Sequence, residues 1–153
     1  MSAVGNFVWF ITGGILMGLF WCLFGVMAYL SIFGIPWGKA CFVIAQFTFF
    51  PFGKTAISRS ELNLKQDIGT GNWGMAGNLI WFLFAGVWLA MFHLIWALAN
   101  FTTVIFIPFG IQHLKLASIA LAPIGKTIVS NEVAKAAMEA NAKLKVEKLR
   151  LTN

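Results

Sequence analysis

The stretch Gly34-Ile35-Pro36-Trp37-Gly38 decides the fold of this chain, because its pattern returns as Ile107-Pro108-Phe109-Gly110 in a second apolar tract. Each residue from Gly5 to Ser58 aligns without gaps with the residue 72 positions later, and fifteen of these 54 pairs are identical. A period of this length exceeds the roughly 20–50 residues of soluble solenoid repeats, whereas duplicated units are common in membrane proteins. The sequence therefore predicts a tandem duplication.

The composition indicates that both copies lie in a membrane. Hydrophobic residues make up 59% of the chain and charged residues only 10%, and residues 1–38 carry no charged side chain. About 20 apolar residues cross a bilayer as an α-helix, so each apolar tract is long enough for at least one span. We therefore predict an all-α integral membrane protein.

Glycine and proline divide each apolar tract into two helices. The first helix runs from about Asn6 to Phe33. It should end at Gly34 to Pro36, because glycine is a poor interior helix residue and proline lacks an amide donor. Proline is favourable at the start of the next helix, which ends near Phe50. The predicted helix-break and turn residues are Gly34, Pro36, Gly38, Pro108 and Gly110.

Each repeat is thus expected to contain a long transmembrane helix and a shorter one that begins at proline. Fifteen residues extend about 22 Å, less than the ~30 Å hydrocarbon core, so the short helix either crosses the membrane, re-enters it or lies in its interface. Lys54 and Lys126 follow the two short helices at equivalent positions. Parallel repeats with two crossings each would place both lysines on the cytoplasmic side, and we prefer this arrangement, with both termini cytoplasmic.

Small residues follow a four-residue spacing on the long helices. Gly14 and Gly18 in the first copy correspond to Gly86 and Ala90 in the second. Such faces let helices approach closely in lipid, although glycine is also simply frequent in spanning helices. We predict a packing role, against either the other repeat or another subunit.

Most polar groups of the apolar tracts lie on the two short helices. Polar groups at membrane depth are costly and often functional, so these residues are candidates for lining a hydrated pathway. The alternative is that the lysines extend to the lipid headgroups. The candidate pathway-lining residues are Lys39, Gln46, Gln112, His113 and Lys115.

The sequence offers little for catalysis. All five acidic residues lie in the connecting loop or the tail, and His93 and His113 have no evident carboxylate partner. Cys22 and Cys41 lack metal-ligand spacing. We therefore expect no catalytic residue, no metal, no cofactor and no enzyme. The formal net charge of +6 is explained by the bias toward basic cytoplasmic segments, without any nucleic-acid partner.

Four segments result from these patterns. Residues 1–58 form the first membrane repeat, 59–76 a polar connecting loop, 77–129 the second membrane repeat and 130–153 an amphipathic helical tail capped by Ser130. The tail is expected to lie in the cytoplasm, where it rests on anionic lipid headgroups, pairs with a partner helix, forms a coiled coil or remains free in solvent.

Several motifs resemble the YccF-type inner-membrane domain of bacteria. They are the Gly-Ile-Pro-x-Gly turn at 34–38, the Pro-Phe-Gly-Lys sequence at 51–54, Glu61-Leu62-Asn63, and Glu139-Ala140-Asn141-Ala142. The resemblance covers nearly the whole chain and includes its two-copy arrangement. It implies a multi-pass protein of the bacterial inner membrane and assigns no functional residue. Phe106 and Ile124 replace Gly34 and Phe52 in the second copy.

Two functional hypotheses follow. In the first, a homo-oligomer forms a small channel or a transporter-like component whose hydrated pathway is bordered by the short helices. In the second, the protein is a membrane scaffold or assembly factor that uses its glycine faces to oligomerise and its tail to bind a cytoplasmic protein. Four segments are too few to enclose a wide pathway, so only the first hypothesis requires an oligomer.

Overall fold

The two repeats fold into the same succession of elements. The computed structural model describes residues 2–152, so Met1 and Asn153, which the predicted segments include, lie outside the described residues. The first repeat contains α1 (Ser2–Trp9), η1 (Phe10–Gly14), α2 (Ile15–Leu30), η2 (Ile32–Gly34), α3 (Ile35–Phe49), β1 (Lys54–Ser58) and α4 (Arg59–Asn63). The second contains α5 (Asn72–Trp81), η3 (Phe82–Gly86), α6 (Val87–Phe101), η4 (Val104–Phe106), α7 (Ile107–Leu121), β2 (Lys126–Ser130) and α8 (Asn131–Thr152).

Each repeat is a helical hairpin of a long and a short helix, as the sequence predicts. The helices α1 and α2 join through the π-helical turn η1, and α5 and α6 join through η3 at the equivalent residues. The stretches Ala3–Leu30, Asn72–Phe101 and Val104–Leu121 are long and apolar enough to cross a membrane. The short helices α3 and α7 begin one residue before Pro36 and Pro108.

The turn between α2 and α3 requires glycine for steric reasons. Gly34 is buried, and a Cβ atom at this position would lie 2.3 Å from the carbonyl oxygen of Ala28. The equivalent residue of the second hairpin is Phe106, which ends the η4 turn and carries a full side chain. The two hairpins therefore share their proline and differ in how their turn is packed.

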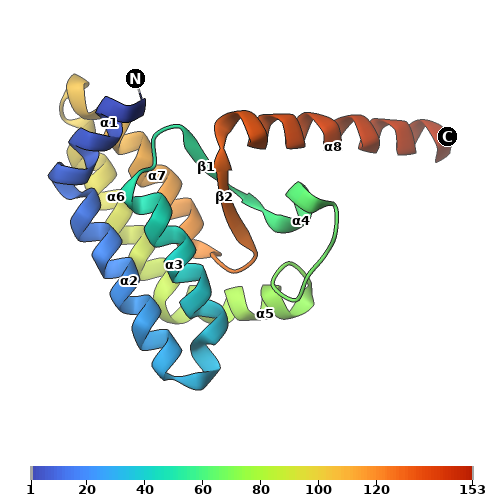
Figure 1. Ribbon diagram of the computed structural model, residues 1–153, viewed down its shortest axis with the longest axis horizontal. Coiled ribbons are helices and arrows are strands. Elements are labelled where there is room, and N and C mark those ends of the chain that lie inside the picture. The colour runs from blue at the N-terminus through green and yellow to red at the C-terminus, as the bar shows by residue number, and fades with distance from the viewer. Residues whose placement is uncertain (1, 153) are drawn as a thin grey trace.

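The hairpins lie side by side in opposite directions. The Trp21 ring stacks on Trp81 at 6.3 Å between centroids, while Trp9 and Trp96 line the same small pocket. The start of α2 therefore lies beside the end of α6, and the middle of α2 lies beside the end of α5 (Figure 1). A two-fold axis that crosses the helices relates the repeats.

A short antiparallel ribbon lies on this axis. Strands β1 and β2 pair so that Ala56 faces Ile128, its own equivalent 72 residues later, and Lys54 faces Ser130 while Ser58 faces Lys126. The sequence did not predict these strands: β1 was placed at the end of the first membrane repeat, and β2 at the end of the second repeat and the start of the tail. Gly53 and Gly125 precede them with φ angles of +83° and +88°, a region that glycine alone adopts readily.

The two repeats were expected to run in the same direction, and this expectation is wrong. Lys54 and Lys126 lie at opposite ends of the ribbon, because β1 pairs antiparallel with its own equivalent and thereby reverses one repeat relative to the other. Equivalent positions alone do not fix this choice, since a direct repeat in sequence is compatible with either direction in space.

The ribbon and the tail lie along one side of the helices rather than at one end (Figure 1). The helix α8 extends away from the bundle on that side, and Ser130 caps it by accepting a hydrogen bond from the Val133 amide at 3.3 Å. Exposed apolar side chains cover α2 and α6 instead, including Leu19, Leu23, Trp88 and Phe92. Trp9, Trp21, Ile44, Phe47, Leu116 and Ala120 form the core between the hairpins.

Candidate functional site

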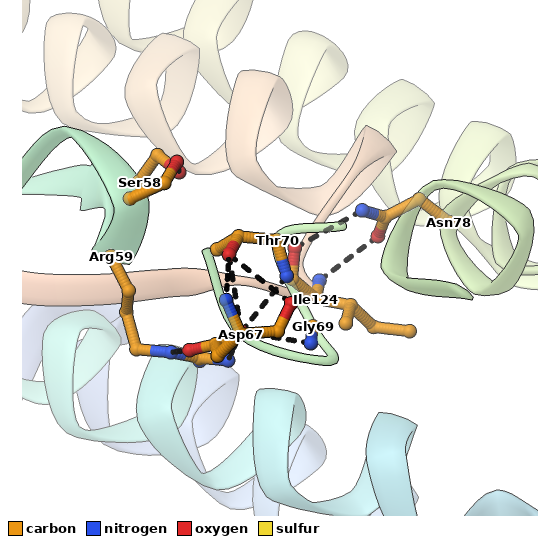
Figure 2. Close-up of polar contacts among 8 residues, drawn as sticks. Ser58, Arg59, Asp67, Gly69, Thr70, Asn78 and Ile124 are labelled. Carbon is orange, nitrogen blue, oxygen red and sulfur yellow. Dashed lines mark hydrogen bonds and ion pairs between the residues drawn. The ribbon is translucent and has the colours of Figure 1, made fainter. Parts of the chain in front are cut away.

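The best-preserved polar contact of the repeats is a clamp at the end of each short helix. The Asn6 side chain donates to the carbonyl of Phe52 at 3.1 Å and accepts from its amide at 2.9 Å. Asn78 makes the same pair with Ile124 at 3.0 and 2.9 Å (Figure 2). Each clamp satisfies one backbone donor and one backbone acceptor in the segment that follows the short helix.

A tryptophan reinforces each clamp. The indole of Trp9 donates to the carbonyl of Thr48 at 2.7 Å, and that of Trp81 donates to the equivalent Ala120 at 2.8 Å. Asn6 and Asn78, like Trp9 and Trp81, are among the fifteen identical pairs of the repeat, and the sequence alone assigned them no role. The signal that could have indicated a role is that these hydrogen-bonding residues are identical in both copies of an otherwise apolar repeat.

The predicted pathway-lining residues do not converge within one subunit. Lys39 and Gln46 are exposed on α3, whereas on α7 Lys115 is half-buried and Gln112 and His113 are buried. Lys39 lines a groove of about 590 Å³, and His113 lines a separate pocket of about 230 Å³. Any shared pathway would therefore have to form between subunits.

Two histidines, one of them the pathway-lining candidate His113, meet in the second hairpin. The Nδ1 atoms of His93 on α6 and His113 on α7 lie 3.2 Å apart, and both side chains are buried. Trp21 and Trp96 stack near these rings. Within residues 2–152, no group of three or more His, Cys, Asp or Glu side chains is placed to hold a metal ion.

Gln112 lies close by on α7 and is incompletely satisfied. Its side chain is only 6% exposed, and its Oε1 atom has no hydrogen-bond partner in the part of the chain that the structure describes. The first repeat has Ala40 at the equivalent position. A buried amide oxygen without a donor is unfavourable by about 1–3 kcal/mol, which makes Gln112 the least satisfied polar group of the helices.

The small faces of the long helices lie against elements of the same subunit. A Cβ on Gly18 would lie 2.3 Å from the Phe49 ring of α3, and one on Gly14 would lie 2.3 Å from the Trp9 indole. On the other hairpin, a Cβ on Gly86 would lie 3.0 Å from the Ala120 carbonyl of α7, and Ala90 is buried. These residues are thus occupied by packing inside each hairpin.

The remaining breaks have similar local roles. A Cβ on Gly38 would approach the Tyr29 ring at 2.8 Å, and one on Gly110 would approach the Phe101 ring at 2.3 Å. Both glycines therefore let the start of a short helix pack against the end of its long helix.

A groove of about 590 Å³, here called the basic groove, opens between α3, α5 and the turn before β2. Its apolar wall includes Ile35, Pro36, Val43, Trp73, Ile80 and Ile124. Its basic side chains are Lys39, Arg59 and Lys126. Trp37 connects its two helical walls, because its indole donates to the Gly77 carbonyl at 3.0 Å.

One acidic residue lies beside the basic groove, and Arg59 pairs with it. Asp67 receives hydrogen bonds from the Arg59 guanidinium at 2.6 and 3.0 Å and from the amides of Gly69 and Thr70 at 2.8 and 2.9 Å (Figure 2). The hydrogen bond from Arg59 holds the pKa of Asp67 well below its usual range, and it raises the pKa of Arg59. Among residues 2–152, no carboxylate lies within 4.0 Å of the amines of Lys39 or Lys126.

Comparisons with known proteins agree with the duplicated architecture. The family YccF, described as inner membrane component domain, matches residues 4–54 and again residues 76–126. The inner membrane proteins YccF of Escherichia coli strain K12 and of Shigella flexneri are each 36% identical over 148 residues, which is 96% of this chain and all of each relative. No solved structure matches the chain.

Proposed function

The chain belongs to the YccF family of inner membrane proteins, and from this premise we propose that it is a membrane-anchored platform whose α8 helix binds an acidic cytoplasmic protein. The two hairpins would anchor the molecule in lipid. The ribbon, α4 and α8 would form the surface that faces the cytoplasm.

The proposal rests on the position of the charged groups. Lys39 and Lys115 lie on the short helices α3 and α7, and the other charged residues lie on the ribbon, α4, the connecting loop and α8. The ribbon and α8 lie along one side of the hairpins (Figure 1). By contrast, α2 and α6 carry no Lys, Arg, Asp or Glu and expose apolar side chains. A lysine at the centre of a bilayer is unfavourable by about 2.5–3.5 kcal/mol even on insertion scales. The charged side must therefore face water, either in the cytoplasm or in a space enclosed by several subunits.

The length of α8 favours the cytoplasm. Its 22 residues extend about 33 Å, which is too long for a small enclosed space. Near its middle, the Asn141 side chain donates to the Glu61 carbonyl at 2.8 Å and holds α8 against α4. Beyond that contact, residues 142–152 are exposed.

The exposed end of α8 has a defined chemistry. It carries four basic residues and one acidic residue, which are Lys143, Lys145, Lys148, Arg150 and Glu147. It also exposes the apolar side chains of Leu144, Val146, Leu149 and Leu151. A partner with apolar contacts surrounded by carboxylates would complement this surface.

A photo-activated cross-linker at Leu149 in the full chain tests the proposal. We expect one acidic soluble protein to be cross-linked in cells, and we expect the combined Lys145→Glu and Lys148→Glu changes to reduce the yield at least tenfold. The matched control places the cross-linker at Leu64, which is also exposed but lies in the connecting loop. A yield that charge reversal leaves unchanged, or cross-links to lipid alone, would refute the proposal.

The orientation is tested separately. In a chain with Cys22→Ala and Cys41→Ala, single cysteines replacing Arg59 and Lys148 should react with an impermeant thiol reagent in inverted vesicles and resist it in intact cells. Reaction of either cysteine from outside intact cells would place the ribbon side away from the cytoplasm and exclude the platform.

The second candidate function is an oligomeric channel or transporter-like component. The unpartnered Oε1 of Gln112 and the exposed Lys39 and Gln46 favour it, because water in a pathway between subunits would satisfy them. Basic residues beside such a pathway favour anions. Purified protein in liposomes should then pass chloride faster than potassium, and Lys39→Glu should reduce that preference. Absence of ion flux across a range of applied potentials would exclude this function.

A further inference from the structure

We propose that the basic groove binds one anionic phospholipid, with an acyl chain along its apolar wall and the phosphate at Lys39 and Lys126. This inference needs only the inner-membrane location and does not depend on a protein partner for α8. Its volume of about 590 Å³ falls within the roughly 300–1,000 Å³ of small-molecule sites.

The groove is held open by contacts between the repeats. Its α3 wall comes from the first hairpin and its α5 wall from the second, and the Trp37–Gly77 hydrogen bond joins them. Gly74 and Gly69, which both line the groove, lie in close backbone contact, because a Cβ on Gly74 would lie 1.9 Å from the Gly69 carbonyl oxygen. Because packed backbone forms its walls, the groove is open before a lipid binds.

The apolar wall continues to the molecular surface. Trp73 and Ile68 line the groove and are 80% and 82% exposed. Tryptophan is enriched at the level of lipid headgroups, and both residues lie next to the polar loop that contains Asp67. The opening of the groove therefore lies at the border between the apolar helices and the charged side of the molecule, where a lipid has its phosphate.

The charges of the groove select an anionic ligand. Asp67 is paired with Arg59, so the groove has two lysines without a carboxylate partner in the described structure. A lysine amine is a mobile point charge that binds phosphate well, and basic pockets between membrane helices on the cytoplasmic side bind anionic headgroups. A zwitterionic lipid would bring a second positive charge toward these lysines.

The repeat supplies an internal comparison. The positions equivalent to Lys39 and Arg59 in the other copy are Ile111 and Asn131, and only the lysine pair Lys54 and Lys126 is shared. The three basic residues of the groove therefore occur together at only one of two equivalent places, so the duplicated fold does not require them. This asymmetry is expected of a ligand site rather than of a structural feature.

Native mass spectrometry of the full chain in detergent, with added phosphatidylglycerol or phosphatidylcholine, tests the proposal. We expect one phosphatidylglycerol to be retained per chain, with an affinity at least tenfold above that for phosphatidylcholine. Each lysine that is neutralised, by Lys39→Gln or Lys126→Gln, should weaken binding about fivefold. Lys65→Gln removes the same charge from the loop outside the groove and should leave binding unchanged.

A second variant separates the groove from general surface charge. Ala76 is an exposed residue of the groove wall, and Ala76→Trp should block the acyl chain without changing the charge, so retention should fall at least tenfold. Circular dichroism confirms that each variant keeps its helix content. Equal binding of the two lipids, an equal effect of Lys65→Gln, no effect of Ala76→Trp, or full displacement by inorganic phosphate would each overturn the proposal.

Discussion

The two hairpins have the same succession of helices and different interiors. Both end their short helix in an asparagine clamp and a tryptophan hydrogen bond. The interior of the first contains Trp21 and Cys41 where the second contains His93 and His113, and Ala40 where the second contains Gln112. Contacts that both hairpins retain thus hold the fold, and residues that differ are where a particular activity can reside.

The largest expected effect comes from breaking what the hairpins share. Asn6→Ala and Asn78→Ala each remove both hydrogen bonds of a clamp and leave a part-buried amide and carbonyl unpaired. We expect each change to lower the free energy of unfolding by about 2–4 kcal/mol, measured by denaturation in mixed detergent micelles. Asn100→Ala is the control, since Asn100 bonds only within its own helix. If the three variants are equally stable, the clamps do not hold the hairpins.

The next effect concerns the packing of small residues in both hairpins. Gly14→Leu and Gly86→Leu introduce side chains where a Cβ would already lie within 3.0 Å of its neighbours. We expect destabilisation of about 1–3 kcal/mol or more for each. Leu16→Ala should have little effect, because Leu16 is exposed on α2. Similar, mild losses of folded protein in all three would show that the glycine faces are not interfaces.

A smaller effect is expected where the hairpins differ. His113→Ala removes the partner of the buried His93 Nδ1 atom, and we expect a loss of about 1–2 kcal/mol in unfolding free energy. Adding His93→Trp, the residue of the first repeat, should recover part of this loss by filling the space. A double variant less stable than the single one would show that the histidine pair is not an exchangeable packing unit.

The smallest effect concerns the loop that joins the hairpins. Asp67→Asn weakens the Arg59 pair and should speed amide hydrogen exchange at Gly69 and Thr70, with little change in global stability because the pair is exposed. The pKa of Asp67 is lowered in the fold, so its contribution is present at neutral pH and is lost only as pH falls through that lowered value. Exchange that is unchanged in Asp67→Asn would show that the carboxylate does not order the loop.

The hairpins could be predicted from the sequence, and their relative direction could not. Repeated prolines and glycines in apolar tracts are local signals that determine where helices begin and end. The antiparallel pairing of Ala56 with Ile128 depends on a contact across 72 residues, and each five-residue strand is too short to show a pattern of its own. The direct repeat gives no sign of the symmetry axis.

The sequence identified the polar residues of the short helices, but it did not predict which part of the molecule each side chain faces. Lys39 and His113 were both identified as polar groups of the short helices, yet one lines the basic groove and the other pairs with His93. The histidine pair was accessible in principle, because a tight hairpin brings residues at equal distances from its turn together. The basic groove was not accessible, since its walls come from different repeats.

The ribbon has a consequence for how such a chain could arise. Because β1 pairs with its own equivalent about a dyad, one unduplicated unit could form the same ribbon with a separate, identical copy of itself. The interface would then be isologous, and every substitution would appear on both sides of it at once. Fusion of the two genes removes that coupling. In a fused chain, Lys39 can be substituted without any change at Ile111. A site can then form on one side of a fold that was symmetric before the fusion.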